Sequence, residues 1–148
     1  MFVTFEYSFP PAARSQTVKR WVHPGIIEKS EMKVYLADLQ NSYYRYIRNS
    51  VPIGMGFVAA YLQKRFGDDI TIRQFRKFEE LHEALAEESP DLVAFGSYSW
   101  NTLLTLKSAT YIKTHHPDTL IAVGGPDVSQ NFAITSAELK QNPQVDFY

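Results

Sequence analysis

The chain has 148 residues, of which 45% are hydrophobic and 14% aromatic, and its formal net charge is -1 at pH 7. This length corresponds to about one domain, and the near-zero charge gives no electrostatic signature of binding to nucleic acid or to an anionic membrane. The lack of cysteine excludes disulfides, thiolate metal sites and iron–sulfur clusters within these residues. No apolar run reaches the roughly 18 residues of a membrane-spanning helix, and the N-terminus lacks a signal-peptide layout, so we expect a cytoplasmic protein.

Residues 1–32 differ from the rest of the chain and show no sustained helical or strand period. Four residues break the segment: Pro10, Pro11, Pro24 and Gly25. Two interpretations of this N-terminal extension stay open, namely a segment that wraps around the domain and a partly ordered tail. The regular pattern that follows predicts one domain over 33–148.

The first half of that domain reads as strand, loop, helix, strand and helix. The apolar run "KVYLADL" at 33–39 suits a buried parallel strand, and a polar and aromatic loop follows it at 40–52. The next segment is expected to be a helix that Gly67 ends. Its apolar residues recur at helical spacing: Ile53, Phe57, Ala60 and Tyr61. A β-branched alternation predicts a strand at 70–75, and a short helix ends before Ser89-Pro90.

The second half continues the alternation. The most apolar stretch, "DLVAFGSY" at 91–98, predicts a third strand, and a helix is expected over 101–115 until Pro117 stops it. "TLIAVGG" at 119–125 predicts a fourth strand, after which Pro126 and Asp127 open a loop. A helix near 132–140 and a fifth strand at 145–148 complete the pattern.

This order of elements predicts an α/β fold with a three-layer, doubly wound parallel sheet. It is flavodoxin-like or Rossmann-like, with the strand order 2-1-3-4-5. In such sheets ligands bind beyond the carboxyl ends of the strands, where the winding reverses, which here lies between strands one and three. The loops expected to carry function are 40–52, 97–101 and 124–129. Because the fifth strand coincides with the chain end, we expect a piece of a longer protein.

Gly54, Gly56 and Ala59 match the G-x-G-x-x-A fingerprint of dinucleotide-binding domains. That fingerprint requires the first glycine directly after strand one, whereas residues 40–53 separate Leu39 from Gly54. We therefore expect the glycines to let the helix approach the sheet closely. An NADP-type module, with Arg76 near a 2′-phosphate, stays open as a lesser alternative.

Three ordered stretches of the chain resemble a known family. They are "PIGMGFVAAYLQKRFG", "SPDLVAFGSYSWN" and "IKTHHPDTLIAVGGPDVS". Together they are similar to the N-terminal cobalamin-binding domain of the radical S-adenosylmethionine (radical SAM) enzymes, over about 33–148. The resemblance implies a cobalamin held at the carboxyl end of the sheet, with its nucleotide tail against strands three and four.

The same resemblance implies the residues that contact the cofactor. Glycines after strand four leave room for a bulky ligand, and an aromatic face with polar neighbours after strand three suits a large amphipathic macrocycle. The implied cobalamin-binding residues are Tyr43, Tyr44, Ser97, Tyr98, Ser99, Trp100, Asn101, Gly124, Gly125 and Pro126. No metal ligand is expected from the protein, since adjacent helical residues such as His115 and His116 point in different directions.

One departure from related cobalamin domains concerns the cobalt ligand. Many of them carry Asp-x-His-x-x-Gly after strand one, but the corresponding place here reads Asp38-Leu39-Gln40-Asn41-Ser42-Tyr43. The resemblance therefore implies base-off cobalamin without a histidine from this loop. The family's iron–sulfur cluster and S-adenosylmethionine belong to a C-terminal radical SAM domain, whose cysteine motif this chain lacks.

We accordingly expect a binding module that is not catalytic by itself and whose partners are cobalamin and a radical SAM domain of the parent enzyme. A cofactor-free regulatory or interaction domain of the same fold is the alternative. The missing histidine motif and the aromatic-rich segment 43–46 keep that alternative open.

Overall fold

The computed structural model describes residues 31–40 and 51–148, which belong to one compact unit, Glu31–Tyr148. Its elements in chain order are β1 (Met32–Ala37), α1 (Ile53–Phe66), the short 3-10 helix η3 (Gly67–Asp69), β2 (Ile70–Phe75), α2 (Phe78–Glu87), β3 (Leu92–Gly96), α3 (Thr102–His115), β4 (Leu120–Gly124) and α4 (Phe132–Gln141). Nearly all of the predicted extension, 1–32, and most of the predicted loop, 40–52, lie outside the described residues.

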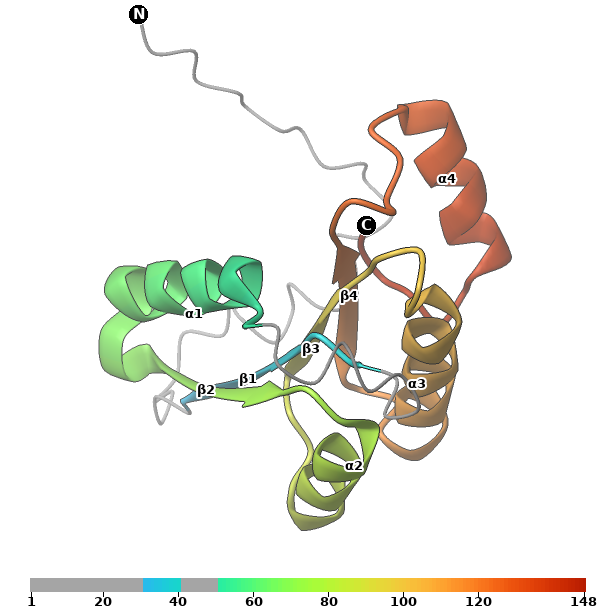
Figure 1. Ribbon diagram of the computed structural model, residues 1–148. Coiled ribbons are helices and arrows are strands. Elements are labelled where there is room, and N and C mark those ends of the chain that lie inside the picture. Colours follow the sequence, from blue (N-terminus) through green and yellow to red (C-terminus); the bar gives the residue numbers. More distant parts are fainter. Residues whose placement is uncertain (1–30, 41–50) are drawn as a thin grey trace, which may run out of the picture. The chain divides into compact units, whose positions relative to one another are not determined.

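The strands form one parallel sheet of four in the order β2-β1-β3-β4 (Figure 1). β1 is central, and its Val34 lies opposite Ile72 of β2 and Leu92 of β3. Helices cover both faces of the sheet, so β1 and β3 read as continuous apolar runs in the sequence, whereas the edge strand β2 is partly exposed and alternates. The sheet confirms the predicted α/β class and the flavodoxin-like order of its four strands.

The predicted fifth strand is reduced to one isolated parallel bridge, between Ala122 and Phe147. Backbone bonds join this segment to β4, with Val123 N donating to Phe147 O at 2.8 Å and Phe147 N donating to Ile121 O at 3.1 Å. The side chain of Asp146 accepts from Ile121 N at 2.7 Å. Because this carboxylate takes a backbone donor of β4, the regular strand ladder stops at a single bridge.

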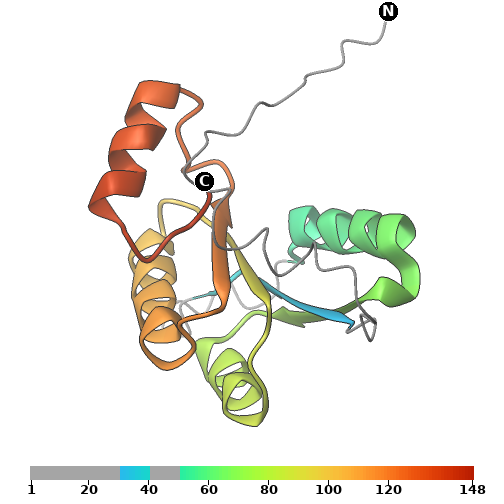
Figure 2. The same cartoon turned by 180° about the vertical axis from the view of Figure 1, so that it is seen from behind.

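Two apolar clusters make the molecule three layers deep, as the two opposite views show (Figures 1 and 2). On one face of the sheet, α2 and α3 pack through Leu81, Leu85, Ala109 and Ile112. On the other face, α1 packs over Val34 and Leu36 of β1. The helices therefore lie on opposite faces, as double winding requires.

Helix α1 packs against the sheet through Ala59, with Met55 and Leu62 beside it. The apolar residues whose spacing indicated this helix lie on its exposed side: Ile53, Phe57, Ala60 and Tyr61. Phe57, for example, is 72% exposed. The helix is thus apolar on both sides, so periodicity alone could not identify its inner face.

The glycines of α1 do not serve close packing, which corrects the sequence-based expectation. Both Gly54 and Gly56 are exposed, and a Cβ added to either would meet no atom of the described residues within 4 Å. Small size at these positions therefore does not bring the helix nearer to the sheet.

Candidate functional site

The winding of the sheet reverses between β1 and β3, because the chain runs from β1 outward to β2 and then returns to β3 on the other side of β1. Ligands of doubly wound sheets bind beyond the carboxyl ends of the strands at such a point. Three segments lie at the carboxyl ends of β1, β3 and β4 (Figure 1). They are Asp38–Gln40, the turn 97–101 that leads into α3, and the loop 124–129 that leads toward α4.

Asn101 connects the ends of β1 and β3 through side-chain hydrogen bonds. Its side chain is 1% exposed, and its amide nitrogen donates to Leu39 O and to Gly96 O, each at 3.0 Å. Its amide oxygen accepts from Tyr98 N at 2.8 Å. Although Asn101 stands at the N-cap of α3, its side chain does not cap the helix. The residue instead holds the end of β1 beside the turn after β3, so the structure gives it a positioning role.

A chain of hydroxyl and carboxylate groups links the turn after β3 to the loop after β4. Ser97 is buried, and its hydroxyl lies 3.3 Å from the Thr102 hydroxyl. The Thr102 hydroxyl is also hydrogen-bonded to the carboxylate of Asp127, and it lies 2.8 Å from Tyr98 O. Neither Thr102 nor Asp127 was among the residues inferred from the sequence. Their positions in the sequence could have indicated them, because Asp127 falls in the loop 124–129 and Thr102 directly follows the turn 97–101.

The backbone of the same two segments is in direct contact. Ser97 N donates to Gly124 O at 2.6 Å, and Asp127 N donates to Ser97 O at 3.3 Å. Gly125 has φ 123°, a conformation that favours glycine, and a Cβ there would lie 2.5 Å from Ser97 O. The glycine is therefore required by Ser97 itself, whereas the sequence analysis attributed it to room for a ligand. Gly124 and Pro126 are exposed, and within 31–40 and 51–148 a Cβ at Gly124 would meet no atom closer than 4 Å.

Two stacked aromatic rings form a flat surface at this edge, which we call the aromatic ledge. The rings of Tyr98 and Trp100 are stacked, with centroids 4.7 Å apart and planes 11° from parallel. Trp100 is 56% exposed and Ser99 is also exposed. Two stacked rings next to each other present a flat aromatic face, and such a face suits flat or macrocyclic ligands.

Asp38 lies directly after β1 and is 9% exposed. Its Cβ and Cγ are each 3.8 Å from the position that a Cβ on Gly96 would take, and the Tyr98 ring is 3.6 Å from the same position. Burial raises the pKa of the Asp38 carboxyl, and the charge of Arg76 opposes that shift in part. Charged groups with a raised pKa at a sheet edge are candidates for a functional site.

Gln40 is the residue that the sequence analysis aligned with the histidine of related cobalamin domains. Its amide oxygen accepts from the Arg76 guanidinium at 2.8 Å, so that oxygen is engaged inside the protein. The remaining predicted contacts on this loop, Tyr43 and Tyr44, lie outside the described residues.

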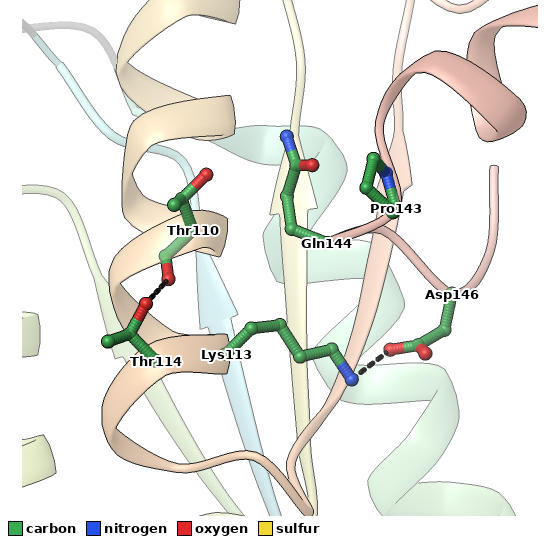
Figure 3. Close-up of a pocket in the computed structure, with 6 residues that line it drawn as sticks. All are labelled: Thr110, Lys113, Thr114, Pro143, Gln144 and Asp146. Carbon is green, nitrogen blue, oxygen red and sulfur yellow. Dashed lines mark hydrogen bonds and ion pairs between the residues drawn. The ribbon is translucent and has the colours of Figure 1, made fainter.

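A shallow pocket of about 430 Å³ lies at a different place, between α3 and the segment that precedes Tyr148 (Figure 3). It is lined by Thr110, Lys113, Thr114, Pro143, Gln144 and Asp146. The Lys113 ammonium donates to Thr119 O at 2.8 Å and pairs with the Asp146 carboxylate at 2.7 Å. Its charged groups are therefore already paired with each other, and the pocket is remote from the ends of β1 and β3.

The described residues contain neither a cluster of metal ligands nor a membrane-spanning helix. Residues 31–40 and 51–148 contain no group of three or more histidine, cysteine, aspartate or glutamate side chains placed to hold a metal ion. In the same part of the chain, none of the helices has the length and apolar character to cross a bilayer.

Comparison with known proteins gives a likeness at the level of the fold. No family model matches the sequence, and no curated protein matches it. Among solved structures, the chain is similar to a novel cobalamin-binding protein from Desulfitobacterium hafniense DCB-2, with a TM-score of 0.58 and 12% sequence identity. The match covers 80% of this chain and 52% of that protein, so this chain spans about half of its length.

Proposed function

We propose that this chain binds base-off cobalamin at the carboxyl edge of its sheet and serves as the N-terminal module of a cytoplasmic, cobalamin-dependent radical SAM enzyme. The observation that carries the proposal is the shared fold with a cobalamin-binding protein, at a TM-score of 0.58. The ordered motifs "SPDLVAFGSYSWN" and "AVGGPDVS" support it, because they form the two segments that meet at this edge.

The residues of the edge fit such a ligand. Trp100, stacked on Tyr98, offers an exposed flat surface, and the exposed Gly124 and Pro126 leave the neighbouring loop without bulky side chains. Gln40, held by Arg76, offers no histidine nitrogen to cobalt. We therefore expect Ser97, Ser99, Trp100 and the loop 124–126 to contact the cofactor, while Asn101 holds the turn that carries them. When bound, cobalamin would supply organocobalt chemistry such as methyl transfer.

The radical SAM context rests on the sequence resemblance alone. With no cysteine in the 148 residues, the iron–sulfur cluster and S-adenosylmethionine would be bound elsewhere in the parent protein. We propose that the reaction belongs to that other part, and that this module holds and orients the cobalamin.

An anaerobic titration of the purified chain with hydroxocobalamin and methylcobalamin, followed by absorbance, tests the proposal. We expect saturable binding with a base-off spectrum. Trp100→Ala should bind more weakly, whereas Thr114→Ala, beside the remote pocket, should bind as the unsubstituted chain does. Absence of any saturable spectral change would overturn the proposal and favour the alternative, a cofactor-free regulatory or interaction domain.

A further inference from the structure

Asp38 is a nearly buried carboxyl group at the junction of β1 and β3. It is 9% exposed, and among residues 31–40 and 51–148 no hydrogen bond reaches its side chain, although its backbone N–H donates to Phe75 O at 3.0 Å. The Asp38 oxygens are not among the fully buried polar atoms that lack a partner in the described residues, so the carboxylate keeps some access to solvent. A carboxylate that is so little exposed loses much of its hydration, and a hydrogen-bond donor on a ligand would compensate for that loss.

Among the described residues, none donates a hydrogen bond to the Asp38 side chain. Arg76 acts on the Asp38 carboxyl through its charge, and the Arg76 guanidinium donates to Gln40 at 2.8 Å. On the other side lie Gly96, which has no side chain, and the ring of Tyr98. Gly96 offers no side-chain donor, and the carbon atoms of an aromatic ring do not donate hydrogen bonds of normal strength.

The position of Asp38 coincides with the point where a ligand is expected. The residue follows the central strand β1, beside the end of β3, where the winding of the sheet reverses. Tyr98 connects it to the exposed aromatic ledge, because the Tyr98 ring lies over Gly96 on one side and stacks on Trp100. Asp38 thus lies near the aromatic ledge, with Gly96 and Tyr98 close to it.

We propose that Asp38 is a ligand-binding residue, whose carboxylate accepts a hydrogen bond from an N–H or O–H group of the bound ligand. This inference rests on the proposed function. An ionised carboxylate only accepts hydrogen bonds, so the ligand must present a donor such as an amide or a hydroxyl. Cobalamin carries both kinds, with amides around the corrin ring and a ribose hydroxyl in its nucleotide tail.

Two variants and a control test the inference by affinity. Asp38→Leu removes every acceptor at similar volume, and Asp38→Asn keeps a neutral acceptor. Asp118→Asn removes a carboxylate from an exposed position just before β4, at the opposite end of the strands, and serves as the control. Each variant is titrated anaerobically with hydroxocobalamin and with dicyanocobinamide, which lacks the nucleotide tail, and circular dichroism confirms that each is folded.

We expect Asp38→Leu to bind hydroxocobalamin about tenfold more weakly than the unsubstituted chain, as the loss of a hydrogen bond to a charged group implies. The affinity of Asp38→Asn should lie between those of Asp38→Leu and the unsubstituted chain, and Asp118→Asn should bind hydroxocobalamin as the unsubstituted chain does. A loss seen with both probes places the donor among the corrin amides, whereas a loss seen only with hydroxocobalamin places it in the nucleotide tail.

Two other results would overturn the inference in distinguishable ways. If the unsubstituted chain binds hydroxocobalamin and both folded Asp38 variants bind it equally well, Asp38 is not a ligand-binding residue and the proposed function stands. If the unsubstituted chain binds neither probe, the proposed function fails, and the inference fails with it.

Discussion

The carbonyl oxygen of Ser97 stands 2.5 Å from the position that a Cβ on Gly125 would take, and Ser97 N would be 3.0 Å from it. The loop after β4 can therefore pass over the end of β3 only with glycine at this position. Gly125 also has φ 123°, which side-chain-bearing residues rarely adopt.

Gly125→Ala should lower the free energy of unfolding by about 2 kcal/mol or more, since the new Cβ adds a backbone clash to a strained φ. Gly124→Ala is the matched control, because a Cβ there would meet no atom within 4 Å and the effect should stay within about 0.5 kcal/mol. Urea unfolding of the two variants measures the difference. Equal effects would show that the loop does not pack on Ser97 as described.

Asp38→Asn should stabilise the fold at neutral pH while it weakens ligand binding. Burial raises the pKa of the Asp38 carboxyl in the folded state above its ordinary value of 3.8. The folded state therefore holds a proton that the unfolded state has lost, so stability falls as pH rises from the unfolded pKa through the folded one. The amide that replaces the carboxyl has no charge to bury. The variant should therefore become more stable than the unsubstituted chain as pH rises through this interval, and it should remain more stable at higher pH.

Urea unfolding of both proteins between pH 3 and pH 7 would measure this effect. The difference in unfolding free energy between Asp38→Asn and the unsubstituted chain should grow with pH and then level off. A difference that shrinks as pH rises would mean that the carboxylate is stabilised in the fold.

Thr105 offers a site for a stabilising substitution. It faces the sheet from α3, is 0% exposed, and its hydroxyl has no hydrogen-bond partner within the described part of the chain. Thr105→Val keeps the shape and removes the unpaired hydroxyl, so we expect a gain of about 1 kcal/mol. Thermal and urea unfolding would measure it, and a loss of stability would show that the hydroxyl has a partner such as a bound water.

The exposed side of α1 should tolerate substitution. Phe57 is 72% exposed, so Phe57→Ala should change the free energy of unfolding by less than about 0.5 kcal/mol. Leu85 of α2 is 2% exposed and belongs to the larger apolar cluster, so Leu85→Ala should cost about 2–5 kcal/mol. Similar losses for the two variants would mean that the Phe57 side of the helix is covered.

The sheet was the most predictable part of this protein. The apolar runs at 33–39 and 91–98 correspond to β1, Met32–Ala37, and β3, Leu92–Gly96, because parallel strands buried on both faces leave a continuous apolar signal. The rule that ligands meet the carboxyl ends of strands also singled out the loops 97–101 and 124–129 as candidates. In the structure these loops are neighbours, since Ser97 N donates to Gly124 O.

Other features depend on contacts that a pattern of residues does not encode. The inner face of α1 was not predictable, since Phe57 outside and Leu62 inside have the same apolar character. The bond between Thr102 and Asp127 joins residues far apart in sequence, and the low exposure of Asp38 is a property of the folded chain. The assignment of the ten cofactor contacts stays a prediction.

Hydrogen–deuterium exchange of the purified chain, with and without saturating hydroxocobalamin, tests most directly that the ligand binds at the carboxyl edge. We predict slower exchange in peptides that cover 97–103 and 124–128, and unchanged exchange in peptides around the pocket residues Thr110 and Gln144. Protection confined to the pocket, or no protection anywhere despite saturating ligand, would contradict the proposed site.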